Sequence, residues 1–272
     1  MAIISIRYFV LFGLLVIFST MSENSRYKIL KQLLADLPRG VPFDLATLEG
    51  VGVSPPLAAR HAKSGWIERL AQGVYAFPND TLDLHRTLVF LQKRVPGLHI
   101  GGKSALSIQG VHHYLNNRER LVLWGDARFR LPDWFVNRFP ARYVHTQLFD
   151  WPNTELPGKT LLTPPGLLDG LHVASQERAV LELLYEAGTK ESLDEARNLF
   201  DGLRSPRREL LGQLLACCTN VKTVRLFLTW ARETGVVNVD DLLRDHAVRT
   251  GSGNRWISRM ADGTLLRLNP HG

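Results

Sequence analysis

The chain has 272 residues, of which 45% are hydrophobic and 22% charged, and its formal net charge is +7. This composition supplies a hydrophobic core and is typical of a soluble globular protein with one large or two modest domains. The positive charge favours an acidic partner without identifying it. The two cysteines, Cys217 and Cys218, are adjacent. Their positions exclude a zinc-type spacing and an unstrained disulfide between them, so we expect buried, reduced thiols.

Met1–Thr20 is an apolar segment that contains one cation, Arg7. Its longest uninterrupted apolar run, Tyr8–Phe18, is shorter than the roughly 20 residues that a membrane span needs, and no A-x-A-like cleavage site follows it. We therefore expect that Met21 is the true start and that residues 1–20 derive from an upstream start codon. A weak membrane anchor is the alternative for this segment.

Residues 21–80 are predicted to form a winged helix-turn-helix domain. Apolar residues at helical spacing predict a first helix over Ser22–Leu37, and a shorter helix is expected over Phe43–Leu48. A glycine-containing turn over residues 50–53 then leads into a third helix and a β-hairpin. This order is typical of a winged helix that binds DNA. The alternative is a small α+β unit that binds a protein.

The third helix is expected to run from Ser54 to Gly65. Ser54 can cap the helix, because a serine hydroxyl accepts a hydrogen bond from an unpaired N–H of the first turn. Gly65 can end it, because glycine tolerates positive φ. The hairpin that follows has a strand from Trp66, a turn over residues 71–73 and a second strand that ends at Phe77.

One side of the third helix is predicted to enter the major groove of DNA. At 3.6 residues per turn, Leu57, Ala58 and His61 fall together, and small and basic residues fall on the other side. The alternative is an ordinary solvated helix face with two cations. The residues expected to contact DNA lie on the second side of this helix, at its start and on the hairpin: Ser54, Pro56, Ala59, Arg60, Lys63, Arg69 and Gln72.

Residues 81–272 are predicted to form a mixed α/β C-terminal domain with a helical second half, so the fold class is α+β. Helices are expected over residues 83–95, 104–108, 175–188, 192–203, 206–217 and 221–233. Short strands are expected over residues 98–100, 121–124, 142–149 and 265–268. Residues 132–137 read as a turn or short helix, and residues 151–170 read as a loop. Glu177 and Glu182 are expected at a helix start and on its exposed face.

Gly97–Ser104 reads GLHIGGKS and formally matches a phosphate-binding loop. The strand-like residues Leu98 and Ile100 lie inside the supposed loop, which favours a strand, a glycine turn and a helix start over a nucleotide site. His112 and His113 have no second metal ligand at a recognised spacing. We therefore expect no enzyme activity, no cofactor and no metal site, and we keep a P-loop nucleotide-binding protein as a less favoured alternative.

The segment SGWIERLAQGVYAF, Ser64–Phe77, resembles the wing of the AbiEi-type antitoxins of type IV toxin–antitoxin (abortive infection) systems. Four later segments extend the resemblance: GGKSALSIQGVHHYL at 101–115, ASQERAVLELLYE at 174–186, NVKTVRLFLTWA at 220–231 and GSGNRWIS at 251–258.

The resemblance implies a two-domain cytoplasmic antitoxin. Its winged helix would bind inverted repeats in its own promoter and repress the operon. Its C-terminal domain would contribute to DNA binding and counteract a nucleotidyltransferase-like toxin, with or without a stable complex. A stand-alone winged-helix regulator without a toxin is the alternative.

Overall fold

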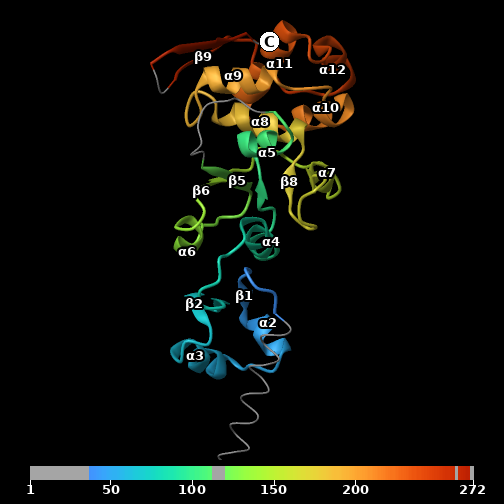
Figure 1. The fold of residues 1–272 in the computed structure, drawn as a ribbon. Helices are drawn as coiled ribbons and strands as arrows, with labels where there is room; N and C mark the ends of the chain where they lie inside the picture. The colour runs from blue at the N-terminus through green and yellow to red at the C-terminus, as the bar shows by residue number, and fades with distance from the viewer. Residues whose placement is uncertain (1–36, 112–119, 261–262, 270–272) are drawn as a thin grey trace, which may run out of the picture. The chain divides into compact units, whose positions relative to one another are not determined.

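The structure is a computed structural model that describes residues 37–111, 120–260 and 263–269 (Figure 1). Its internal contacts divide the chain into two compact units, unit 1 (Met1–Phe90) and unit 2 (Leu91–Gly272). The division falls later in the chain than the domain boundary expected after residue 80, which stays a prediction. The apolar segment 1–20, most of the first predicted helix and the two histidines at 112 and 113 lie outside the described residues.

The described part of unit 1 has the helix, helix and hairpin order of a winged helix. Its elements are β1 (Phe43–Asp44), α2 (Leu45–Gly50), α3 (Pro55–Lys63), β2 (Glu68–Ala71) and β3 (Val74–Ala76). The strands form an antiparallel sheet in the order β1-β3-β2. The expected α+β fold class is confirmed.

The hydrophobic core of unit 1 contains residues of β1, α2, α3 and β3. Leu48 of α2 and Ala58 of α3 are fully buried, and they share a cluster with Ile67, Tyr75 and Phe77. Ala58 is small, so α3 can lie close to the elements beneath it. The core therefore fixes which side of α3 faces inward.

Two expectations for unit 1 were wrong in detail. Phe43 belongs to β1, where it pairs with Tyr75 of β3, and the second helix starts after it. Asp44 caps this helix by accepting a hydrogen bond from the Thr47 N–H at 2.9 Å. Ser54 occupies the N-cap position of α3, but its hydroxyl makes no capping hydrogen bond. Pro56 at the second helical position lacks an N–H, which removes one of the two donors that such a hydroxyl normally reaches.

Unit 2 contains a mixed five-stranded sheet in the order β6-β5-β4-β8-β7. Its strands are β4 (His99–Ile100), β5 (Leu121–Gly125), β6 (Ala141–His145), β7 (Leu161–Leu162) and β8 (Val173–Ala174). Strand β4 pairs antiparallel with β5 and parallel with β8. Helix α4 (Leu84–Arg94) crosses the division between the two units, and three shorter helices of unit 2 follow it: α5 (Gly102–Ile108), α6 (Asp133–Val136) and α7 (Leu156–Lys159).

The second half of unit 2 is helical, as expected. Its helices are α8 (Gln176–Glu186), α9 (Leu193–Asp201), α10 (Arg208–Cys217), α11 (Val221–Thr234) and α12 (Val239–Asp245). Helices α5 and α8 lie beside the sheet, and helices α9 to α12 lie on the far side of α8 (Figure 1). A hairpin of β9 (Trp256–Arg259) and β10 (Leu265–Leu268) ends the described chain. Leu226, Phe227 and Trp230 of α11 are buried, so their expected role as core is confirmed.

Several elements of unit 2 differ from the expectation. Strand β6 ends at His145 rather than continuing to Phe149. The segment 151–170 contains α7 and β7 rather than only loop. Helix α7 is easily missed because it contains Pro157 and Gly158, and the Asn153 side chain starts it by accepting hydrogen bonds from two N–H groups, those of residues 155 and 156. Helix α12 and strands β8 and β9 had not been expected.

Candidate nucleic-acid interface

Helix α3 presents its basic side to solvent. Ala58 and His61 point into the core, with exposed fractions of 0% and 7%, and Leu57 is half-buried. The predicted division of the helix into two sides is therefore confirmed. The residues that were expected on its outer side are all exposed: Ser54, Pro56, Ala59, Arg60 and Lys63.

The outer side of α3 is a short positive surface. The helix carries no acidic residue in its first turn, and Arg60 and Lys63 lie in its last turn. Cations in the last turn also interact favourably with the helix dipole. Nine residues give a helix about 13 Å long, which matches a major groove about 12 Å wide. An element of this size and charge can insert into the groove.

The hairpin of β2 and β3 forms the wing beside α3. Strand β2 is an edge strand of the sheet, and the turn between β2 and β3 has Gly73 at φ +69°. Arg69 and Gln72 are both exposed, and the Arg69 Nε donates to the Ala71 carbonyl at 3.4 Å. The buried side of the hairpin is held by Tyr75. The structure thus brings the two predicted wing residues to the surface, while their contact with DNA stays a prediction.

The junction between α3 and β2 contains a residue that the sequence analysis missed. Gly65 ends the helix with φ +77°, as expected, and Trp66 follows it with 52% of its surface exposed. The apolar pattern predicted Trp66 as part of a strand, but Ile67, 1% exposed, takes the core position and β2 begins at Glu68. A glycine followed by tryptophan at the end of a basic helix was the available signal. Trp66 adds an exposed aromatic ring next to α3.

Comparison with known families identifies the chain. A family model described as a transcriptional regulator, the AbiEi antitoxin of type IV toxin–antitoxin systems, matches residues 118–268. A model of the N-terminal domain of AbiEi antitoxin transcriptional regulators matches residues 26–117. The chain belongs to the AbiEi antitoxin family. The suspected resemblance is confirmed, and the family is one of transcriptional regulators rather than of enzymes.

A solved structure has the same fold as this AbiEi chain. The crystal structure of the RV2827C protein from Mycobacterium tuberculosis matches it with a TM-score of 0.54 and 18% sequence identity. The match covers 85% of this chain and 87% of that one. No curated protein matches the sequence. Within the part of the chain that the structure describes, no helix has both the length and the apolar character needed to cross a membrane.

The GLHIGGKS motif of this AbiEi chain is not arranged as a phosphate loop. Strand β4 lies inside the motif, and α5 begins at Gly102. The Gly102 N–H, which would face a phosphate, donates instead to the Glu182 carboxylate at 2.9 Å. Lys103 forms ion pairs with Glu191 at 2.9 Å and Glu195 at 3.1 Å. The anion-binding groups of the motif therefore bind carboxylates of the chain itself, as the favoured interpretation requires.

Glu182 is the main correction to the expected charges of unit 2. It was expected on an exposed helix face, but it is fully buried. Besides Gly102, it accepts from the Arg178 Nε and the His99 Nε2, each at 2.8 Å. Burial raises the pKa of the Glu182 carboxyl, but His99 and Arg178 outweigh burial and hold that pKa below its ordinary value. Glu182 thus links α8 to β4 and α5. Helical periodicity did not predict this burial, because two of its partners, His99 and Gly102, are distant in sequence.

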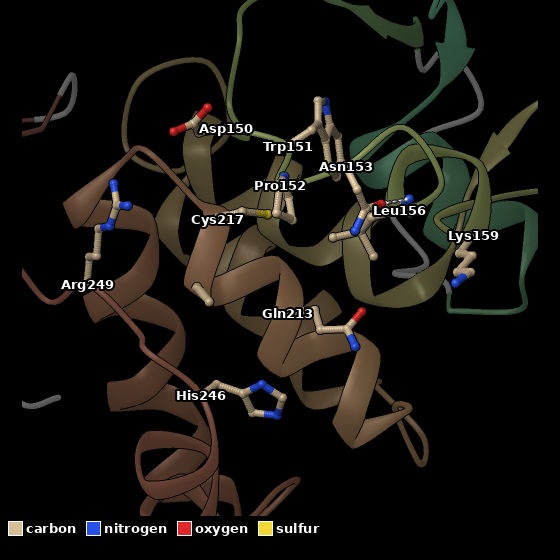
Figure 2. Close-up of a pocket in the computed structure, with 11 residues that line it drawn as sticks. Asp150, Trp151, Pro152, Asn153, Leu156, Lys159, Gln213, Cys217, His246 and Arg249 are labelled. Atoms are coloured by element: carbon tan, nitrogen blue, oxygen red, sulfur yellow. Dashed lines mark hydrogen bonds between the residues drawn. The ribbon is translucent and has the colours of Figure 1, made fainter.

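A surface pocket of unit 2 has a volume of about 500 Å³. Figure 2 shows Cys217 and Gln213 of α10 between the Asp150–Asn153 segment and His246. Both thiols were expected to be buried; Cys218 is buried, but Cys217 is half-buried. Burial raises the pKa of Cys217 to about 11, so its thiol is protonated at neutral pH. Among the described residues, no cluster of His, Cys, Asp or Glu could hold a metal ion.

Proposed function

We propose that this AbiEi-family chain is a DNA-binding transcriptional repressor and antitoxin of the cytoplasm. Its winged helix binds inverted repeats in its own promoter, and the chain counteracts a nucleotidyltransferase-like toxin with or without a stable complex. The observation that carries the DNA-binding half is the exposed, acid-free outer side of α3, with Arg60 and Lys63, beside an exposed wing.

Each element of this surface has a distinct part in the proposal. Arg60 and Lys63 contact base edges or phosphates from within the major groove. The small outer residues Pro56 and Ala59, with Ser54 at the helix start, let the helix backbone approach the duplex. On the wing, Arg69 and Gln72 contact the phosphate backbone beside the groove. Cations that bind phosphates release counterions, so affinity falls steeply as salt is raised.

A gel shift with a paired control tests the DNA-binding half. Arg60→Ala combined with Lys63→Ala removes two exposed cations from α3. Arg86→Ala combined with Lys93→Ala removes two exposed cations from α4 and matches the loss of charge. We expect the first pair to abolish the shift of a duplex from upstream of the gene, with an unchanged circular dichroism spectrum, and the second pair to keep it. Equal binding by the two variants would refute the assignment of α3.

The antitoxin half needs a separate test. We expect that coexpression of the chain relieves the growth arrest caused by a nucleotidyltransferase-like protein encoded beside it. An expression vector with a foreign promoter removes any effect of repression on toxin level. Growth arrest that persists despite soluble antitoxin would reject this half and leave a stand-alone regulator.

A further inference from the structure

The C-terminal hairpin of unit 2 has two faces of different character. In the register of β9 and β10, Ile257 lies opposite Arg267, and Arg259 lies opposite Leu265. Because side chains alternate along a strand, these four residues share one face. All four are exposed, and the apolar pair is strongly so, with 56% for Ile257 and 49% for Leu265. We call this set, together with Arg255, the outer ribbon face.

The opposite face of the hairpin attaches it to the helices. Leu268 is 2% exposed and Met260 6%, and β10 packs against α11. Gly188 leaves space for the Met260 side chain, since a Cβ there would lie 2.0 Å from its sulfur. An isolated two-stranded hairpin is marginal in water, so this packing supports the ribbon.

Arg225 of α11 fixes the base of the ribbon. It is 1% exposed, and its guanidinium donates to the carbonyls of Thr250 at 2.7 Å, Ser252 at 2.5 Å and Asn254 at 2.7 Å. A planar guanidinium with several donors suits three acceptors that converge in this way. The segment that leads into β9 is therefore held in one conformation by a residue from the middle of a long helix.

The arginines of the outer ribbon face differ from the ion-paired arginines of unit 2. Within the described part of the chain, Arg255, Arg259 and Arg267 form no ion pair, and Arg255 donates only to the Asn269 side chain at 3.3 Å. Elsewhere in the unit, acidic groups neutralise the arginines at 130, 142, 178, 197, 207, 208, 232 and 244. The outer ribbon face thus carries three exposed arginines that form no ion pair with a described residue.

We propose that the outer ribbon face is a second contact surface for double-stranded DNA, which docks in the major groove. This inference rests on the proposed DNA-binding function but concerns a surface separate from α3. The major groove admits a two-stranded antiparallel ribbon. Arg255 and Arg259 are four residues apart, about 13 Å along an extended strand, close to the groove width of about 12 Å.

The distribution of residue types along β9 favours a duplex over an acidic protein. The two arginines lie toward the ends of the strand, where they reach the phosphates that border the groove. Ile257 lies between them, and apolar side chains at that position meet thymine methyl groups on the groove floor. Arg267 faces Ile257 across the ribbon and can reach a base edge.

Salt-dependent binding tests the proposal. Arg255→Gln, Arg259→Gln and Arg267→Gln are combined in the full-length chain, and affinity for the upstream duplex is measured by fluorescence anisotropy between low and moderate salt. Each lost phosphate contact lowers the slope of log K against log salt by about 0.9. We expect the slope to fall by about 2, since two of the three arginines contact phosphates. The control combines the same change at three exposed, ion-paired positions of unit 2, namely 130, 232 and 244, and should change the slope by less than 1.

The possible results separate this inference from the proposed function. An unchanged slope, or equal changes in the ribbon and control variants, would overturn the ribbon contact even if α3 is essential. Absence of binding by the wild-type chain would overturn both. A second variant, Ile257→Ala with Leu265→Ala, tests the groove position. We expect a severalfold loss of affinity with the slope unchanged, and full affinity would mean that the ribbon does not reach the groove floor.

Discussion

Removal of the Glu182 charge is expected to destabilise unit 2 strongly. Glu182→Gln keeps the shape of the side chain but leaves Arg178 buried without a carboxylate partner, although Arg178 also donates to the Thr160 hydroxyl at 3.1 Å. The new amide N–H₂ also faces donors, the Gly102 N–H among them. Breaking a buried ion pair typically costs about 3 to 5 kcal/mol. We expect the free energy of unfolding to fall by about 3 kcal/mol, because glutamine keeps one acceptor.

The assay is urea unfolding followed by far-UV circular dichroism at several pH values. Glu209→Gln on the exposed surface of α10 is the control, with an expected change within about 0.5 kcal/mol. Because the folded-state pKa of Glu182 lies below its ordinary value of 4.5, its charge stabilises the fold above that pH. The contribution disappears as pH falls through the folded-state pKa, so the difference between wild type and variant should shrink in acid. A change under 1 kcal/mol at pH 7, or one that does not shrink, would refute the reasoning.

Three further predictions concern other parts of the chain. Arg225→Met should lower the free energy of unfolding by about 2 to 4 kcal/mol, and hydrogen exchange should show the earliest loss of protection near residues 250–254. Protection that falls elsewhere first would contradict this. Gly65→Ala should cost about 1 kcal/mol in a urea melt because φ is +77°, whereas Gly253→Ala, at ordinary φ, should cost much less. Equilibrium dialysis should show no ATP binding; binding that Lys103→Ala removes would reinstate a phosphate loop.

Local signals predicted the elements that local chemistry determines. Gly65 ends α3, and Ser175, Ser192 and Asn220 each cap the helix that was expected after them. A cap or a glycine at positive φ acts within one turn, so a single sequence contains the information. Strand β1 was not predicted, because two residues are too few to show an alternating pattern. It forms only through its pairing with β3.

For the candidate interface, too, local signals predicted one part, and packing between distant residues decided the rest. Helical periodicity predicted which side of α3 is exposed, because the positions of Ala58 and His61 define a single buried stripe. It misplaced Trp66, since an apolar residue next to a strand can face either way until the packing of Ile67 is known. The outer ribbon face could not be predicted, because the pairing of β9 with β10 decides which residues share a face.

The central claim is that the outer side of α3 lies against DNA, and cleavage by a tethered iron–EDTA group tests it most directly. The reagent is attached to Ala59→Cys, and to Thr81→Cys as an exposed control beyond the wing. At pH 7 labelling favours the introduced thiol, because burial raises the pKa of Cys217 to about 11 and of Cys218 to about 12. We predict cleavage of the upstream duplex at discrete positions within each repeat from residue 59, and little from residue 81. Equal, scattered cleavage from both positions would contradict the account.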